Sequence, residues 1–145
     1  MMFYLLLSIL FISVIVEGSL SVLPLVMISL LLWVVLGYSK QALVGAFLAG
    51  LLLDVFLLRT SGLSGVFFIM FVFIITLYQR KLEIRTFQFV LFSSFFGSLT
   101  YLYLFRVQHV FILAVISAIV SILLFSILRK VNALLKKQKS LQYAL

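Results

Sequence analysis

The sequence consists of long apolar runs separated by short polar breaks, and this pattern most limits the folds open to the chain. Hydrophobic residues make up 66% of the 145 residues and charged residues only 10%, and the mean hydropathy is +1.41. Because soluble domains have about 25% charged residues, this chain has too little polar surface to face water. A helix needs about 20 apolar residues to cross a bilayer, so the chain has room for roughly six such helices.

Six apolar segments follow one another, and we expect each to form a transmembrane helix. Strands of a membrane barrel alternate apolar and polar residues, and the run 43–53 shows no such alternation, so helices are the remaining solution. Pro24 lies in the first turns of the second segment, where its missing N–H is tolerated. We predict an all-α integral membrane protein with a six-transmembrane-helix bundle at 1–128 and a basic cytoplasmic tail at 129–145. The predicted helices are 3–16, 20–38, 41–58, 63–78, 87–105 and 110–128.

The basic residues lie between or after the apolar runs, so they indicate topology. The chain has 11 Lys and Arg against 3 acids. With the N-terminus in the cytoplasm, only Arg59 and Arg106 fall outside, together with Glu17, as the positive-inside rule requires. No folded basic face is predicted, which argues against nucleic acid as a partner. The nine cytoplasmic basic residues are Lys40, Arg80, Lys81, Arg85, Arg129, Lys130, Lys136, Lys137 and Lys139.

Small residues recur every four positions in the third segment and form a stripe along one helix face. Small side chains let another helix approach closely in lipid. Gly62 and Gly65 allow a tight turn and close packing at the start of the fourth segment. The stripe either packs inside the bundle or binds a partner or substrate. Its residues are Ala42, Ala46, Gly50 and Asp54, widened by Gly45 and Ala49.

Asp54 is the only acid that we place inside an apolar run, about one turn from the outer end of its helix. Acids in such places usually face the bundle interior and are paired. Arg59 and Arg106 are candidate partners, and the alternative is that Asp54 caps the 60–62 turn or a neighbouring helix. Ion coupling normally needs more than one buried ionisable group, which disfavours that role.

The sequence has few residues of the types that form catalytic and metal sites. The chain has no cysteine, and its single histidine, His109, has no second histidine to complete a metal site. No nucleophile or phosphate-loop motif occurs, so we expect neither an enzyme nor a cofactor. In the tail, Val131, Leu134, Leu135 and Leu141 lie among basic residues at helical spacing. The tail is expected either to extend the sixth helix or to lie on the inner membrane surface, and its basic residues are expected to contact the membrane surface or a cytoplasmic partner.

One stretch resembles a known family. Pro24 begins an apolar helix, a polar break follows at 38–40, the small-residue run 45–54 ends at Asp54, and 62–65 reads Gly-Leu-Ser-Gly. This pattern resembles the MreD family of bacterial rod shape-determining membrane proteins. The clear resemblance covers about forty residues.

The resemblance implies a fold and a function. The fold would be similar to the substrate-binding subunits of energy-coupling-factor vitamin transporters. The function would be a non-catalytic scaffold of the cell-elongation complex in the bacterial cytoplasmic membrane, with both termini in the cytoplasm. Its partners would be the bitopic protein MreC and, indirectly, MreB, RodA and a penicillin-binding protein. The alternative is a substrate-capture subunit of such a transporter, with a polar pocket built from Asp54, Arg59, Arg106 and His109.

Overall fold

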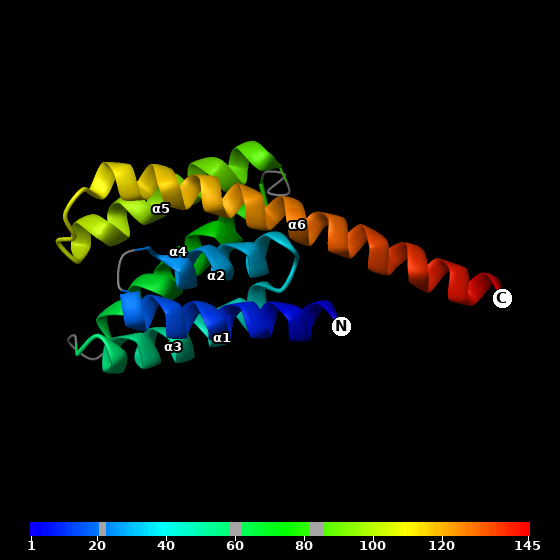
Figure 1. The fold of residues 1–145 in the computed structure, drawn as a ribbon, viewed down its shortest axis with the longest axis horizontal. Coiled ribbons are helices and arrows are strands. Elements are labelled where there is room, and N and C mark those ends of the chain that lie inside the picture. Colours follow the sequence, from blue (N-terminus) through cyan, green and yellow to red (C-terminus); the bar gives the residue numbers. More distant parts are fainter. Residues whose placement is uncertain (21–22, 59–61, 82–85) are drawn as a thin grey trace.

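The computed structural model describes residues 1–20, 23–58, 62–81 and 86–145, and this part of the chain is entirely helical between its turns (Figure 1). An all-helical structure agrees with the fold class expected from the apolar runs. The helices are α1 (Met2–Leu20), α2 (Leu25–Val35), α3 (Ser39–Phe56), α4 (Leu63–Gln79), α5 (Phe87–Leu104) and α6 (Val110–Ala144).

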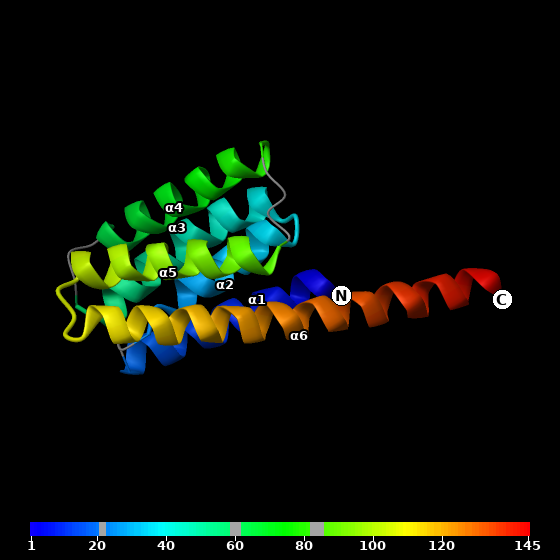
Figure 2. The same cartoon turned by 90° about the horizontal axis from the view of Figure 1, so that it is seen from above.

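Successive helices run in opposite directions, so the bundle has two distinct ends (Figure 1). The C-terminal ends of α1, α3 and α5 meet the N-terminal ends of α2, α4 and α6 at one end. We call it the acidic end, because Glu17 and Asp54 lie there in α1 and α3. The other end, where the chain begins, holds Lys40, Arg80 and Lys81, and we call it the basic end. Figure 2 shows that α6 continues far past the basic end.

Helix α2 forms the centre of the bundle. It contacts α1, α3, α4, α5 and α6, and every residue from 26 to 35 is buried. It has only 11 residues, about 16 Å of helix, so the prediction of a helix over 20–38 was wrong. Pro24 stands before the helix rather than in its first turns, and Gly37, at φ 99°, follows its end. Because protein surrounds α2, its length need not match the bilayer.

The other helices begin close to their predicted positions. Helices α3, α4 and α5 also end within two residues of the predicted ends, whereas α1 and α6 continue further. Four helices in the described part of the chain, α1, α3, α5 and α6, are long and apolar enough to cross a membrane, and α2 and α4 are shorter apolar helices. Helix α1 continues to Leu20, so Glu17 lies within a helix and not in an outer break. Helix α6 does not end at 128 but includes nearly all of the predicted tail.

The outer surface of the bundle is apolar. Large side chains from five of the helices are half or more exposed, which would cause a soluble protein to aggregate. This surface and the apolar helices are those of a membrane protein. Examples of these exposed side chains are Phe11, Phe47, Phe73, Phe92, Phe96 and Phe111.

Candidate functional sites at the acidic end and the outer grooves

Asp54 caps helix α4. Its side chain is 1% exposed. Its Oδ2 accepts hydrogen bonds from the backbone N–H of Gly62 at 2.8 Å and of Ser64 at 3.2 Å. These N–H groups lie at the start of α4, where the helix itself offers no acceptor. Asp54 therefore joins the end of α3 to the start of α4, which is the capping role among the alternatives considered from the sequence.

Glu17 has the same role one hairpin earlier. It is 2% exposed, and its Oε2 accepts a hydrogen bond of 2.8 Å from the backbone N–H of Val26, in the first turn of α2. The hydroxyl of Tyr101 in α5 donates to Glu17 Oε1 at 2.7 Å. Glu17 therefore connects α1, α2 and α5. The sequence predicts a first helix that ends at 16, with Glu17 beyond it. The position of Glu17 inside α1 and its burial correct that prediction.

The two carboxylates share a spacing that identifies them. Glu17 lies nine residues before Val26, and Asp54 lies eight and ten residues before Gly62 and Ser64. In both hairpins an acid in the last turn of one helix satisfies N–H groups of the next. A distance of eight to ten residues from an acid to the start of the next helix is the sequence signal that could have identified Glu17 as a cap. The prediction instead groups Glu17 with Gly18 and Ser19, which follow the predicted end of the first helix.

The small-residue stripe of α3 lies inside the bundle. A Cβ atom on Gly50 would lie 2.3 Å from the Gly65 Cα, so the backbones of α3 and α4 approach closely there. Gly45 faces Leu10 and Trp33 instead. At Gly50 the stripe is not accessible to another protein unless α3 and α4 separate, whereas Gly45 and Ala49 border the hollow between α1 and α3. All of its members, Ala42, Gly45, Ala46, Ala49, Gly50 and Asp54, are buried.

An apolar groove borders α3 and includes Gly45 and Ala49 of the stripe in its lining. The groove lies between α1 and α3, has a volume of about 690 Å³, and is open to the surroundings of the bundle. Leu7 and Phe11 of α1 and Val44, Leu48 and Leu52 of α3 line it with exposed side chains. Its few polar side chains include Ser8 and Gln41. Apolar matter, such as a lipid chain or a transmembrane helix, fits this lining.

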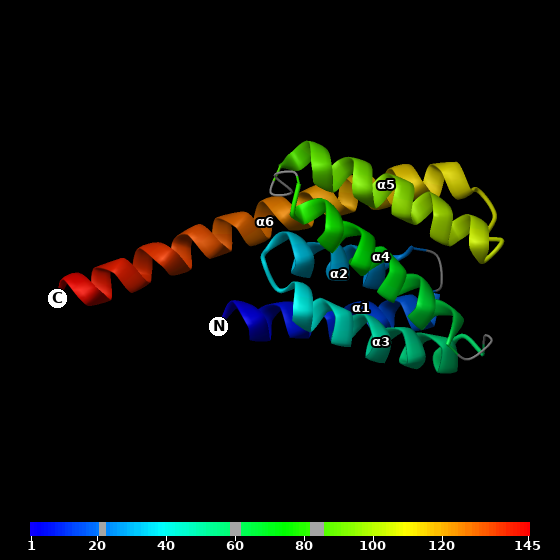
Figure 3. The ribbon, with the colours of Figure 1, turned by 180° about the vertical axis from the view of Figure 1, so that it is seen from behind.

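A second apolar hollow, of about 620 Å³, lies between α4 and α5. Met70 and Ile74 line it from α4, and Phe92 and Phe96 line it from α5. Figure 3 shows these two helices on the side of the bundle away from α1. The two hollows therefore open on different faces, and each can serve as a control for the other.

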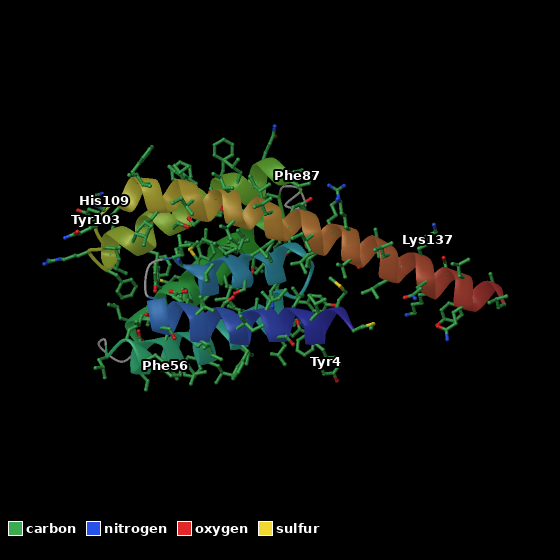
Figure 4. The ribbon with its side chains drawn as sticks, in the orientation of Figure 1. Tyr4, Phe56, Phe87, Tyr103, His109 and Lys137 are labelled. Atoms are coloured by element: carbon green, nitrogen blue, oxygen red, sulfur yellow. The ribbon has the colours of Figure 1, made fainter. Side chains whose placement is uncertain are left out.

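Among the described residues expected for a substrate pocket, Asp54, Arg106 and His109 do not line any of the hollows described for this part of the chain. The oxygens of Asp54 bind backbone N–H groups, whereas Arg106 and His109 are exposed in the turn between α5 and α6. Both have positive φ, at 52° and 57°. Figure 4 shows His109 at the acidic end of the bundle. Arg59 lies outside the described residues. In the described part of the chain, no three His, Cys, Asp or Glu residues could hold a metal ion together.

The basic residues gather toward one end of the molecule. Among the described residues, Lys40, Arg80 and Lys81 lie at the basic end of the bundle, and only Arg106 lies at the acidic end. The remaining five, Arg129, Lys130, Lys136, Lys137 and Lys139, lie on the part of α6 that continues past the basic end.

Comparison with known proteins leaves the family open. No protein-family model matches the chain, and no curated protein or solved structure compared with it gave a match.

Proposed function

We propose that this chain is a non-catalytic membrane scaffold of the bacterial cell-elongation complex. In this role it binds an MreC-like bitopic protein and, through it, MreB, RodA and a penicillin-binding protein that together direct peptidoglycan synthesis and cell shape. The observation that supports the proposal best is the unit formed by residues 24–65, which carry the resemblance to MreD. Pro24 precedes the central helix, Gly50 of α3 contacts Gly65 of α4, and Asp54 caps α4.

A six-span arrangement in the cytoplasmic membrane belongs to this proposal. The alternating helices and the concentration of basic residues at one end support it, with that end and both termini in the cytoplasm. Helix α2 is too short to span the bilayer alone. Because other helices surround it, α2 need not match the thickness of the bilayer by itself.

We assign the transmembrane helix of the MreC-like protein to the α1–α3 groove. Most of the small-residue stripe is occupied by contacts within the chain, and its members Gly45 and Ala49 border the groove. The groove supplies apolar side chains from two helices, and helix association in membranes depends on packing of this kind. Val44 and Leu48 are 62% and 55% exposed on its wall, so larger side chains there would fill the groove without disturbing the core.

Co-purification in mild detergent tests the proposal. The tagged chain is expressed with the full-length MreC-like protein of the same genome, and capture is compared among variants. Val44→Trp with Leu48→Trp should abolish capture, because the new rings occupy the groove. The matched control, Val66→Trp with Ile119→Trp, changes residues on α4 and α6 that are equally exposed and should retain capture.

The outcomes separate the function from the binding surface. If the wild-type chain never captures the MreC-like protein, the scaffold proposal is wrong. If the groove variant captures as well as wild type, the function stands and the groove assignment is wrong. Size-exclusion profiles of all variants must be equal, so that loss of capture cannot be attributed to misfolding.

A further inference from the structure

Helix α6 is much longer than a bilayer requires. Its 35 residues span about 52 Å, whereas the hydrocarbon core is about 30 Å thick. The apolar part ends near Leu128, and the projecting segment, residues 129–144, extends past the bundle without a break (Figures 1 and 2). No glycine or proline occurs between 110 and 144, so the sequence contains no residue that would bend the helix there.

The projecting segment has an apolar stripe with coiled-coil spacing. Positions 131, 134, 138, 141 and 145 follow one another at intervals of three and four residues. This is the repeat by which two helices pack side by side. Four of these positions are apolar, and the fifth is the polar residue Gln138. The apolar residues are Val131, Leu134, Leu141 and Leu145. Leu134 and Leu141 are 65% and 57% exposed, so this chain leaves the stripe largely uncovered.

One flank of the stripe is basic, and the other holds Leu135 and Gln142. Residues 129–145 contain five Lys and Arg and no acid. Lys130 and Lys137 directly precede stripe positions, and both are exposed. In a coiled coil these flanking positions face the charged side chains of the partner helix. Arg129 differs, because its guanidinium lies over the Phe87 ring of the bundle, 5.5 Å from the centroid. Figure 4 shows Lys137 well beyond the bundle.

We propose that the projecting segment of α6 is a docking helix for an acidic amphipathic helix of another protein. The partner helix covers Leu134 and Leu141 with its own apolar stripe, and its flanking glutamates or aspartates face Lys130 and Lys137. This inference does not depend on the scaffold function.

The observations favour this occupant over two others. A second copy of the chain would bring two segments of five positive charges together with no acid to pair with them. The membrane surface would require the helix to turn sharply after 128, and the helix is continuous there. An acidic helix satisfies both the apolar stripe and its basic flank.

The start of the chain adds to the docking surface. A hollow of about 760 Å³ lies between Met1 and Met2 and the side of the segment formed by Leu135, Leu141 and Leu145. Lys136, Gln138, Lys139 and Gln142 also line this hollow, so a helix placed on the stripe would contact polar side chains there as well as the apolar side chains of Met1 and Met2. Burial of the apolar surface would strengthen binding.

Binding of designed peptides to the full-length chain in nanodiscs tests the proposal. Three labelled helical peptides serve as probes. The first has leucine at the core heptad positions and glutamate at the flanking positions, the second has lysine in place of the glutamates, and the third has glutamine in place of the leucines. Only the first should bind in a fluorescence anisotropy titration, and its affinity should fall as salt rises. Equal binding of two or more peptides would overturn the proposal.

Paired variants locate the binding surface. Leu134→Gln with Leu141→Gln should weaken the acidic peptide by about tenfold or more, which corresponds to loss of two apolar contacts. Ala133→Gln with Ser140→Gln, exposed positions outside the stripe, should not. Lys130→Glu with Lys137→Glu should likewise weaken binding more than the same charge change at Lys136 and Lys139. Equal effects within either pair would contradict the geometry.

The alternative occupants have their own signatures. A spin label at Tyr143→Cys should be accessible to a water-soluble relaxation agent in nanodiscs of anionic lipid. Protection by lipid would assign the segment to the membrane surface and overturn the proposal. Concentration-dependent dimers that disappear in the Leu134→Gln and Leu141→Gln variant would assign the segment to a second copy, with the same consequence.

Discussion

Replacing Gly50 by alanine probes the closest helix contact in the bundle. The added Cβ would lie 2.3 Å from the Gly65 Cα and 2.5 Å from its backbone N, far inside van der Waals contact. Both atoms belong to the backbone, so a side-chain rotation cannot remove the overlap. Helices α3 and α4 must move apart, and their separation would strain the Asp54 cap that joins them.

The magnitude follows from two opposing effects. Alanine is favoured over glycine in a helix by up to about 1 kcal/mol. Forcing an additional methyl group into a packed contact costs about 1–3 kcal/mol, and more where the neighbour is backbone. We therefore expect Gly50→Ala to lower the free energy of unfolding by about 1–3 kcal/mol.

Gly65→Ala is the matched control, because it changes the same contact from the other side. Its Cβ would lie 3.8 Å from the nearest atom, the Phe47 carbonyl oxygen, which is an ordinary contact. The steric cost of the added methyl group is then absent, and only the higher helix propensity of alanine relative to glycine remains. Gly65→Ala should be neutral or stabilising by up to about 1 kcal/mol.

Trp33 provides the assay. It is the only tryptophan in the chain, it is 2% exposed, and its indole N–H donates to the Leu6 carbonyl at 3.1 Å. Its fluorescence should therefore report separation of α1 from α2 during unfolding in mixed micelles. Equal destabilisation by Gly50→Ala and Gly65→Ala, or none by Gly50→Ala, would refute the asymmetric contact.

Four further substitutions test three other contacts by the same unfolding assay. Asp54→Ala leaves two N–H groups of α4 unpaired and should cost about 1–3 kcal/mol, and an unchanged midpoint would exclude the cap. Tyr101→Phe and Glu17→Gln, measured singly and together, should show a coupling of about 0.5–2 kcal/mol, whereas additive effects would mean that their hydrogen bond contributes nothing. Gly97→Ala places a Cβ 2.5 Å from the edge of the Phe71 ring, which can rotate away. Its cost should be smaller than that of Gly50→Ala, and a larger cost would contradict this reasoning.

Local signals in the sequence predicted the starts of several helices. The predicted starts at 63, 87 and 110 coincide with those of α4, α5 and α6. Gly62, with φ at 93°, precedes α4, and the side chain of Thr86 accepts a hydrogen bond from Phe89 N at the start of α5. These boundaries depend on residues next to them in the chain, so local patterns are sufficient to find them.

The errors concern features that depend on distant residues. Apolar composition cannot distinguish a helix in lipid from one enclosed by other helices, so the short α2 was predicted as a full span. Glu17 is buried because Tyr101, 84 residues away, and Val26 satisfy it. Similarly, the spacing of the α3 stripe indicates close packing but does not say which helix approaches it. That choice depends on the α3–α4 turn and on Gly65.

Photo-crosslinking in living cells tests the proposed scaffold function most directly. A photoreactive residue is placed at Leu48 in the α1–α3 groove or at Val66 on α4, both of which are exposed, and the MreC-like protein of the same genome is detected in the products. We predict a crosslink from Leu48 to the transmembrane helix of the MreC-like protein and none from Val66. A crosslink from Val66 alone would place the partner on another face of the bundle. The absence of a crosslink from both Leu48 and Val66 would contradict the scaffold function.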